Sequence, residues 1–332
     1  MASGTENKLD SDALSAAIRW QEEGHSVALA IVMATWGSSP RPVGSLLAAR
    51  DDGLFTGSVS GGCVEGAVLL SARQVIADGK PRRQSFGISD EDAWAASLAC
   101  GGSMEVLILR PPALSPLQEA LHERRASALA LRLDGSAWGI VAADRKLGSL
   151  LPSDLALART YLIDDRTALD ETGQFFVCCF APRPRLLIVG ATHIAQVLAE
   201  MAPMAGFDVA VIDPRPAFGD PARFQGTAHH QDDPARILPM LGLDERTGVV
   251  TLTHQPRIDE EALALALDSP CFYIGALGSK KTHAARLAKL GRGQDRIHGP
   301  IGLDIGARTA SEIAVAILAE AIQAWRKGRH TS

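Results

Sequence analysis

The stretch RLLIVGATHIAQVLAEMAPMAGFDVAVIDPR, residues 185–215, decides the fold of the C-terminal half of this chain. Its first apolar run, at residues 186–189, has no polar interruption, which is typical of a strand buried on both faces of a parallel sheet. Gly190 ends that strand, and apolar residues at spacings of three and four over residues 193–204 predict an amphipathic helix. Gly206 ends the helix, and residues 209–212 predict a second strand. This order of elements is the repeating unit of a doubly wound parallel sheet.

The turn between the first strand and the helix departs from the dinucleotide-binding pattern G-x-G-x-x-G/A. Gly190 and Ala195 match its outer positions, whereas Thr192 stands where the middle glycine is expected. That glycine lets the backbone approach a pyrophosphate closely, so Thr192 is expected to crowd NAD in the ordinary pose. Asp213 lies 23 residues after Gly190, near the distance at which such folds place an acid over a ribose. An NAD(P)-dependent oxidoreductase is therefore kept as an alternative function.

The chain beyond Asp213 repeats the alternation of strands and helices. Strands are predicted near residues 226–229, 248–253 and 271–276, and helices at residues 235–241, 260–267, 282–290 and 309–326. The pattern predicts an α/β domain with a doubly wound parallel sheet. In such sheets, ligands lie beyond the carboxyl ends of the strands.

A glycine-rich turn at residues 275–279 leaves one of these strands and enters a helix that begins with two lysines. A helix N-terminus presents free backbone amides and a partial positive charge, so Gly278, Ser279 and Lys281 are candidates to hold a phosphate. The turn is not a Walker A loop, because no glycine directly precedes the lysine before Thr282. A solvated basic helix start is the alternative interpretation.

The most informative stretch of the N-terminal half is GSVSGGCVEGAVLLSARQVIADG, which starts at Gly57. Gly61 and Gly62 bring bare backbone to the start of a helix that is predicted to begin near Cys63. The field of a helix N-terminus lowers the pKa of a thiol, which makes Cys63 a candidate thiolate. Glu65 falls in the first turn, where an acid is also the ordinary capping choice.

A second cysteine, Cys100, lies on a glycine-rich turn before an apolar strand at residues 104–109. We expect at least one of Cys63 and Cys100 to be functional; the alternative is that both are small buried residues. A structural metal site is disfavoured because no other Cys or His stands nearby at ligand spacing.

The N-terminal half is predicted to form a domain of its own. Its predicted helices are at residues 10–23 and 117–125, and its predicted strands at residues 26–33, 45–49, 54–57, 104–109, 127–133, 137–142 and 175–180. Residues 181–185 contain two prolines spaced by arginines and predict a linker. The predicted domains are therefore residues 1–180 and residues 185–328.

Composition limits the classes of function. A chain of 332 residues is long enough for two domains, and no apolar run approaches the length of a membrane span. The first residues lack the basic and apolar regions of a signal peptide, so a cytoplasmic protein is expected. An odd number of cysteines, five, fits a reducing compartment. The net charge of −5 gives no electrostatic reason to expect nucleic acid as a partner.

Five motifs in this order resemble the XdhC/CoxI family of accessory proteins for molybdenum hydroxylases. They are GSVSGGCVEGAV, CGG at residues 100–102, LLIVGATHIAQ, FYIGALGSKKTHAARL and PIGLDIGARTASEIA. The resemblance implies an N-terminal α/β XdhC/CoxI domain and a C-terminal Rossmann-like domain. It further implies a chaperone that binds the molybdenum cofactor and assists its sulfuration with a cysteine desulfurase. Such a chaperone delivers the cofactor to an apo molybdenum hydroxylase, such as xanthine or carbon monoxide dehydrogenase, and is itself not expected to be an enzyme.

Carried onto this sequence, the resemblance and the motifs above give one set of candidate cofactor-binding residues. They are Gly61, Gly62, Cys63, Cys100, Gly190, His193, Asp213, Gly278, Ser279 and Lys281. We expect the phosphate end of the cofactor on the C-terminal sheet and the metal end towards the two thiols, with the nucleotide form of the cofactor left open. An interaction module that binds only protein partners is a further alternative. The apolar final helix allows a homodimer, although its face is more simply part of the core.

Overall fold

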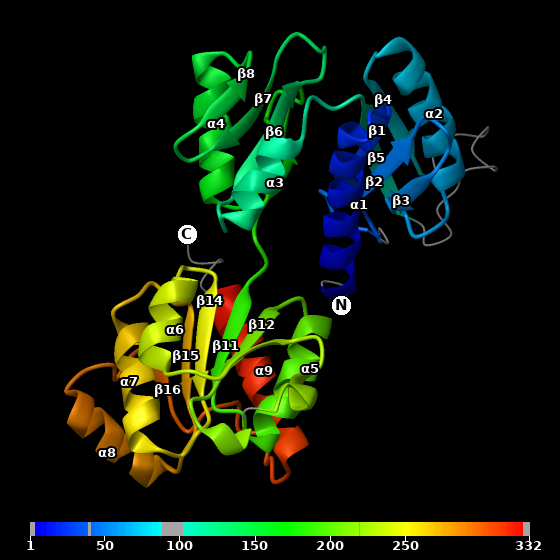
Figure 1. Cartoon of the computed structure of the whole chain (residues 1–332). Helices are drawn as coiled ribbons and strands as arrows, with labels where there is room; N and C mark the ends of the chain where they lie inside the picture. Colours follow the sequence, from blue (N-terminus) through cyan, green and yellow to red (C-terminus); the bar gives the residue numbers. More distant parts are fainter. Residues whose placement is uncertain (1–3, 39–40, 88–101, 219, 328–332) are drawn as a thin grey trace. The chain divides into compact units, whose positions relative to one another are not determined.

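The computed structural model describes residues 4–38, 41–87, 102–218 and 220–327 (Figure 1). The chain divides into two compact units, Met1–Pro182 and Arg183–Ser332. Each unit has buried hydrophobic clusters of its own. Within the described residues, no helix combines the length and the apolar composition that a membrane span requires.

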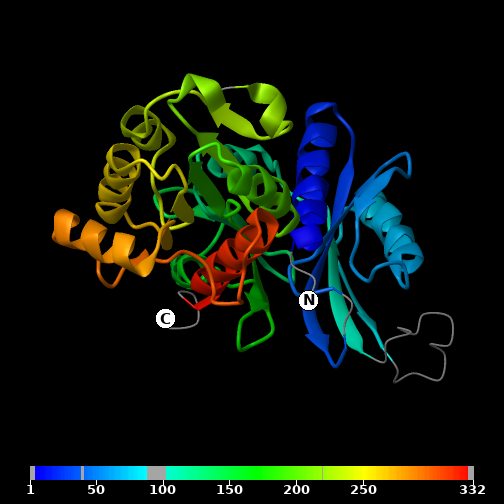
Figure 2. The same cartoon turned by 90° about the horizontal axis from the view of Figure 1, so that it is seen from below.

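The first sheet of the N-terminal unit has five antiparallel strands in the order β3-β2-β1-β5-β4. They are β1 (Val27–Trp36), β2 (Leu46–Arg50), β3 (Phe55–Gly57), β4 (Arg82–Phe86) and β5 (Ser103–Leu109). Side chains alternate across β1, so Leu29 and Ile31 share a buried cluster with α1 (Gly4–Glu22), whereas Ala28 and Val32 share one with α2 (Glu65–Asp78). The two helices therefore cover opposite faces of the sheet (Figure 2).

The second sheet of this unit is also antiparallel and has the order β8-β7-β6-β10-β9. Its strands are β6 (Ser127–Arg132), β7 (Trp138–Ala142), β8 (Lys146–Gly148), β9 (Ala168–Leu169) and β10 (Phe175–Phe180). One face shares the cluster of α1 and α3 (Ser115–His122), and the other packs on α4 (Pro152–Ile163). The sequence patterns did not predict α4, β4, β8 or β9.

The C-terminal unit is built on six parallel strands in the order β13-β12-β11-β14-β15-β16. They are β11 (Arg185–Val189), β12 (Asp208–Ile212), β13 (Ala228–His230), β14 (Thr247–Thr251), β15 (Tyr273–Ala276) and β16 (Ile297–His298). Ile188 at the centre of β11 pairs with Val211 on one side and Val250 on the other. The predicted doubly wound parallel sheet is confirmed, and its strand order reverses between β11 and β14.

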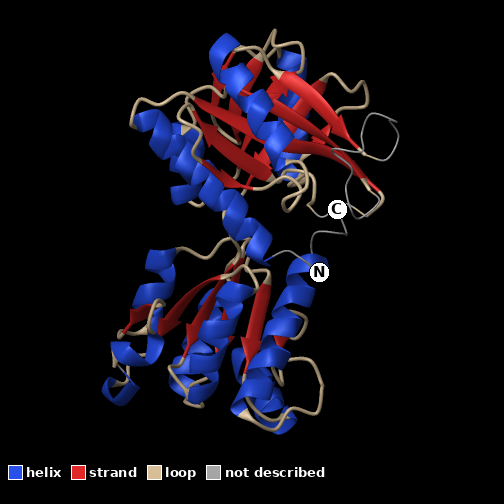
Figure 3. Cartoon of the chain, turned by 90° about the vertical axis from the view of Figure 1, so that its right-hand side faces the viewer, coloured by secondary structure: helices blue, strands red, loops and turns tan. Residues whose placement is uncertain are grey.

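Helices enclose both faces of this sheet (Figure 3). On one face, α5 (His193–Met204) and α9 (Ala310–Lys327) pack on Leu186 and Ile188. On the other face, α6 (Pro234–Leu241) and α7 (Pro256–Leu267) pack on Leu187 and Val189. The helix α8 (Lys280–Leu290) joins the second face through Leu287 and Leu290. The strict alternation along β11 explains why its apolar run has no polar interruption.

Candidate functional site at the carboxyl edge of the parallel sheet

The carboxyl ends of β11 and β14 meet where the strand order reverses, and Gly190 forms the turn at this point. Gly190 has a φ of 112°, and a Cβ placed on it would lie 2.8 Å from the backbone nitrogen of Thr253. A larger residue would therefore collide with the backbone that follows β14. The turn leads directly into α5, whose first residue, His193, is exposed.

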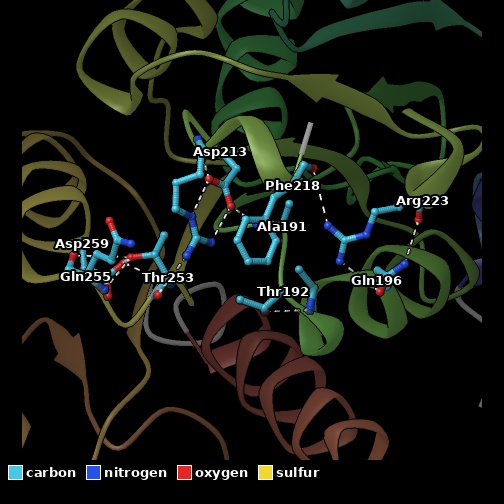
Figure 4. Close-up of polar contacts among 11 residues, drawn as sticks. Ala191, Thr192, Gln196, Asp213, Phe218, Arg223, Thr253, Gln255 and Asp259 are labelled. Carbon is cyan, nitrogen blue, oxygen red and sulfur yellow. Dashed lines mark hydrogen bonds and ion pairs between the residues drawn. The ribbon is translucent and has the colours of Figure 1, made fainter. Parts of the chain in front are cut away.

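Thr192 is the N-cap of α5 (Figure 4). Its backbone is extended, and its Oγ1 accepts a hydrogen bond of 3.4 Å from the backbone nitrogen of Ala195. In the dinucleotide pattern, the amides of this first turn face a pyrophosphate. Thr192 therefore both adds bulk at the turn and engages one of the amides that such a ligand uses.

Asp213 follows β12 and is fully buried. Its Oδ2 accepts hydrogen bonds from the backbone nitrogen of Ala191 at 2.7 Å and from Arg215 Nη2 at 2.6 Å. Its Oδ1 accepts from the backbone nitrogen of Arg215 at 3.0 Å and from Arg215 Nε at 2.9 Å. Both oxygens thus receive two donors each, which fills the lone pairs of a carboxylate. The acid expected over a ribose instead ties the Gly190 turn to the end of β12.

The charge of Asp213 is held by its neighbour. Burial alone raises the pKa of Asp213, but hydrogen bonds from Arg215 and Ala191 outweigh burial and keep the pKa below its usual range. The guanidinium of Arg215 lies 4.0 Å from the centre of the Phe218 ring. Arg215 is therefore fixed over the edge of the sheet by an ion pair on one side and an aromatic ring on the other. The sequence analysis did not single out Arg215.

The loop after β14 is held by a buried acid, Asp259. Its Oδ1 accepts from Thr253 Oγ1 at 2.6 Å and from the backbone nitrogen of Thr253 at 3.2 Å (Figure 4). Burial is the main cause that raises the pKa of Asp259. The next residue in the loop, His254, is exposed and has a φ of 57°, in the left-handed region. This bend aims the loop away from the Gly190 turn without a glycine.

The carboxyl end of β15 carries the second glycine turn. Gly278 has a φ of 146°, and Ser279 caps α8 by accepting a hydrogen bond of 3.1 Å from the backbone nitrogen of Thr282. The first turn of α8 has no acidic residue, and Lys280 and Lys281 are exposed. The candidates Gly278, Ser279 and Lys281 therefore share one helix N-terminus, as the turn pattern predicts.

In the N-terminal unit, Glu65 is the first residue of α2 and organises the loop before it. Its carboxylate accepts from Ser58 Oγ at 2.6 Å and Ser60 Oγ at 2.5 Å. It also accepts from the backbone nitrogens of Val59 at 3.2 Å, Ser60 at 2.9 Å and Gly62 at 2.8 Å. Burial raises the pKa of Glu65, but these hydrogen bonds lower it to about 2. Glu65 is therefore a loop-forming residue, whereas the sequence suggested an ordinary cap.

The start of α2 corrects one prediction. The helix begins at Glu65 after the N-cap Val64, and not near Cys63. The reason is that the Glu65 side chain folds the preceding glycines, Gly61 and Gly62, into the loop, with φ values of 79° and 123°. Gly61, Gly62 and Cys63 are all exposed on this loop. Cys63 is a free thiol outside the helix.

The structure therefore groups the candidates by unit. Gly61, Gly62 and Cys63 lie on the Glu65 loop of the N-terminal unit, whereas Cys100 lies outside the described residues. In the C-terminal unit, the remaining candidates lie at the carboxyl edge of the sheet, at the turns before α5 and α8 and at the end of β12: Gly190, His193, Asp213, Gly278, Ser279 and Lys281. In the part of the chain that the structure describes, no group of three or more His, Cys, Asp or Glu side chains is placed to hold a metal ion.

These features define a class of protein. A Rossmann-type domain with an altered nucleotide turn follows an α/β unit with two antiparallel sheets. Residues 186–321 match the XdhC Rossmann domain, and residues 20–87 match the XdhC and CoxI family. The chain belongs to the XdhC/CoxI family.

Relatives of known description extend over nearly the whole chain. It is 30% identical over 305 residues to the molybdenum cofactor insertion chaperone PaoD of Escherichia coli, covering 90% of this chain and 83% of that one. It is 26% identical to a probable xanthine dehydrogenase component of Bacillus subtilis, covering 91% and 94% of the two chains. A crystal structure described as a xanthine dehydrogenase from Bacillus halodurans matches with a TM-score of 0.76 and 25% identity, over 95% of this chain and 96% of that one.

Proposed function

We propose that this protein binds the molybdenum cofactor in the cytoplasm, assists its sulfuration and inserts it into an apo molybdenum hydroxylase of the xanthine or carbon monoxide dehydrogenase type. The similarity to a molybdenum cofactor insertion chaperone over 90% of the chain supports this role. The cofactor supplies the molybdenum centre to the target enzyme, so the chain itself needs to bind, protect and release it.

The observation that carries the proposal is the character of the carboxyl edge of the C-terminal sheet. Both α5 and α8 begin there without an acidic residue in the first turn, so their partial positive charges are not neutralised by a side chain of that turn. The acid that a dinucleotide site offers to a ribose, Asp213, is occupied by Arg215. This edge suits a phosphate better than a nicotinamide nucleotide. The pterin of the molybdenum cofactor carries such a phosphate.

The residues proposed to hold the phosphate end are those of the two helix starts. Gly190 and His193 belong to α5, and Gly278, Ser279 and Lys281 belong to the turn and first residues of α8. The exposed ammonium group of Lys281 is free to reach a ligand beyond the sheet. We assign Asp213 a positioning role, because it fixes the Gly190 turn through the amide of Ala191.

We assign the exposed thiol of Cys63 to the sulfuration step. Sulfur transfer by a cysteine desulfurase requires a thiol or a cofactor sulfur site that the partner can reach, and Cys63 is exposed on the loop of residues 58–64. Soft thiols also suit molybdenum and its sulfur ligands. Cys100 is proposed to act with Cys63 in this step.

The test is retention and transfer of the cofactor. Purified protein is loaded with molybdenum cofactor and desalted, and the retained pterin is measured by fluorescence after oxidation. Wild type is expected to retain the cofactor and to activate an apo hydroxylase, whereas Lys281→Ala retains less and Cys63→Ala activates less. The control is Lys289→Ala, at the other end of α8, where the lysine pairs with Glu260. No retention by wild type would overturn the function, and equal retention by Lys281→Ala and Lys289→Ala would remove Lys281 from the site.

A further inference from the structure

Arg286 is a buried guanidinium beneath the glycine turn that leads into α8. Its relative exposure is 7%, and its Nη2 donates a hydrogen bond of 3.0 Å to the carbonyl oxygen of Leu277. A Cβ placed on Gly278 would lie 3.8 Å from the same Nη2 and 3.1 Å from Thr282 Cγ2. Glycine at 278 therefore leaves the guanidinium uncovered on the side of the turn.

The other terminal nitrogen of this guanidinium, Nη1, is buried and has no hydrogen-bond partner among the residues that the structure describes. Asp259 is close enough to feel the charge of Arg286, but its Oδ1 already accepts two hydrogen bonds from Thr253. A buried charged donor without an acceptor is costly, and native proteins rarely keep one without a reason. An anion at the turn would supply the acceptor.

The surroundings of Arg286 are positively charged on the side of α8. The first turn of the helix has no acidic residue and carries Lys280 and Lys281. His283 adds a second buried polar atom without a partner in the described parts of the chain, its Nδ1. Two such atoms on one helix, next to a glycine turn, mark this helix start as incomplete without a ligand.

We propose that residues 277–282, together with Arg286, form a subsite for a single phosphate group, held by Arg286 Nη1, the amides at the start of α8 and the Lys281 ammonium. The connection between β15 and α8 has only residues 277–279. A loop of this length is too short to wrap a diphosphate as a longer phosphate-binding loop does, so the site takes a phosphomonoester. The identity of the phosphate as that of the molybdenum cofactor rests on the proposed function, whereas the subsite itself does not.

The direct experiment is titration of the full-length protein with inorganic phosphate, followed by NMR of backbone amides and arginine side chains. Phosphate is expected to shift the amides of residues 278–282 and the Nε–Hε signal of Arg286 in the wild type, and chloride at equal ionic strength is not. This measurement needs no variant, so a destabilised mutant cannot obscure it. Signals that move equally with chloride, or that do not move, would overturn the subsite.

Variants then assign the binding residue. Arg286→Gln is expected to weaken phosphate affinity by about tenfold or more, because a charge-assisted hydrogen bond in a buried setting is lost. The control is Arg292→Gln, which removes an exposed arginine that pairs with Asp268 beyond the end of the same helix. Equal weakening in both variants would show a general charge effect and contradict the assignment.

Cofactor retention separates this inference from the proposed function. Phosphate binding without retention of molybdenum cofactor would leave the subsite in place and overturn the function. Retention of the cofactor by Arg286→Gln at the wild-type level, together with absence of phosphate binding, would leave the function in place and overturn the subsite.

Discussion

Arg215 closes over Asp213 with an ion pair of 2.6 Å, and this pair stands where a dinucleotide-binding domain offers a free carboxylate to a ribose. The acid is at the expected place after β12, but its oxygens face the protein. The same sheet that suits a nucleotide by topology is therefore modified at the atoms that a nucleotide contacts. The fold of this domain and its ligand preference are separate properties.

The pair is expected to be a large contributor to the stability of the C-terminal unit. Asp213→Asn leaves the partly buried Arg215 without its counter-ion and is expected to lower the free energy of unfolding by about 3 kcal/mol. The measurement is urea unfolding at neutral pH. The control is Asp268→Asn, which breaks an exposed pair with Arg292 and is expected to cost less than about 1 kcal/mol. Equal losses in the two variants would contradict the structural role of Asp213.

NADH is expected not to bind. Thr192 engages the amide of Ala195, and Asp213 has no oxygen left for a ribose. Fluorescence titration with NADH should therefore show no saturable change for wild type. Thr192→Gly alone is expected not to restore binding, because Arg215 still holds the acid. Saturable binding by the wild type would favour the alternative of an NAD(P)-dependent oxidoreductase.

Glu65 is expected to control both the order of its loop and part of the acid stability. Its folded pKa of about 2 lies below the ordinary value of 4.5, so its contribution is present above pH 4.5 and is lost as pH falls towards 2. Glu65→Gln should flatten the pH dependence of unfolding in that window. It should also speed hydrogen exchange at the amides of residues 59–62, which donate to the carboxylate in the wild type. The exposed Glu200→Gln serves as the control, and identical exchange in both variants would argue against the loop-forming role.

The described cysteines are expected to differ in reactivity. Cys63 is exposed, whereas Cys178 and Cys271 are buried, and burial also raises the pKa of the Cys271 thiol. Brief alkylation of the native protein, followed by peptide mass spectrometry, should label Cys63 before these two. The same treatment in denaturant should label all three equally. Faster labelling of Cys178 in the native state would contradict the burial of β10.

The sequence was sufficient to predict most of the C-terminal sheet because its strands are short apolar runs between glycines. It also located the starts of α5 and α8 within a few residues, since both follow glycine turns. The two-residue strand β16 carries too few positions for a pattern. The helix α4 was missed because one of its buried positions is an acid, Asp154, which pairs with Arg132 at 2.7 Å. A buried ion pair interrupts the apolar period from which helices are predicted.

The candidate sites were predictable in position but not in detail. The turn at Gly190 and the acid at Asp213 were visible, but the direction of the Asp213 side chain depends on Arg215, two residues later. The same holds for Glu65, because the five donors that meet at its carboxylate come from the backbone and hydroxyls of a loop whose path the sequence does not state. Arg286 was invisible for a related reason, since its burial depends on the packing of α8.

The Glu65 loop also bears on how a partner would meet Cys63. A surface loop usually loses conformational freedom when another protein docks on it, and that loss is subtracted from the affinity. Here an internal carboxylate has already fixed the backbone on both sides of the glycines when the chain folds. A protein that approaches the thiol therefore encounters a ready-made shape, and its association rate need not wait for the loop to rearrange.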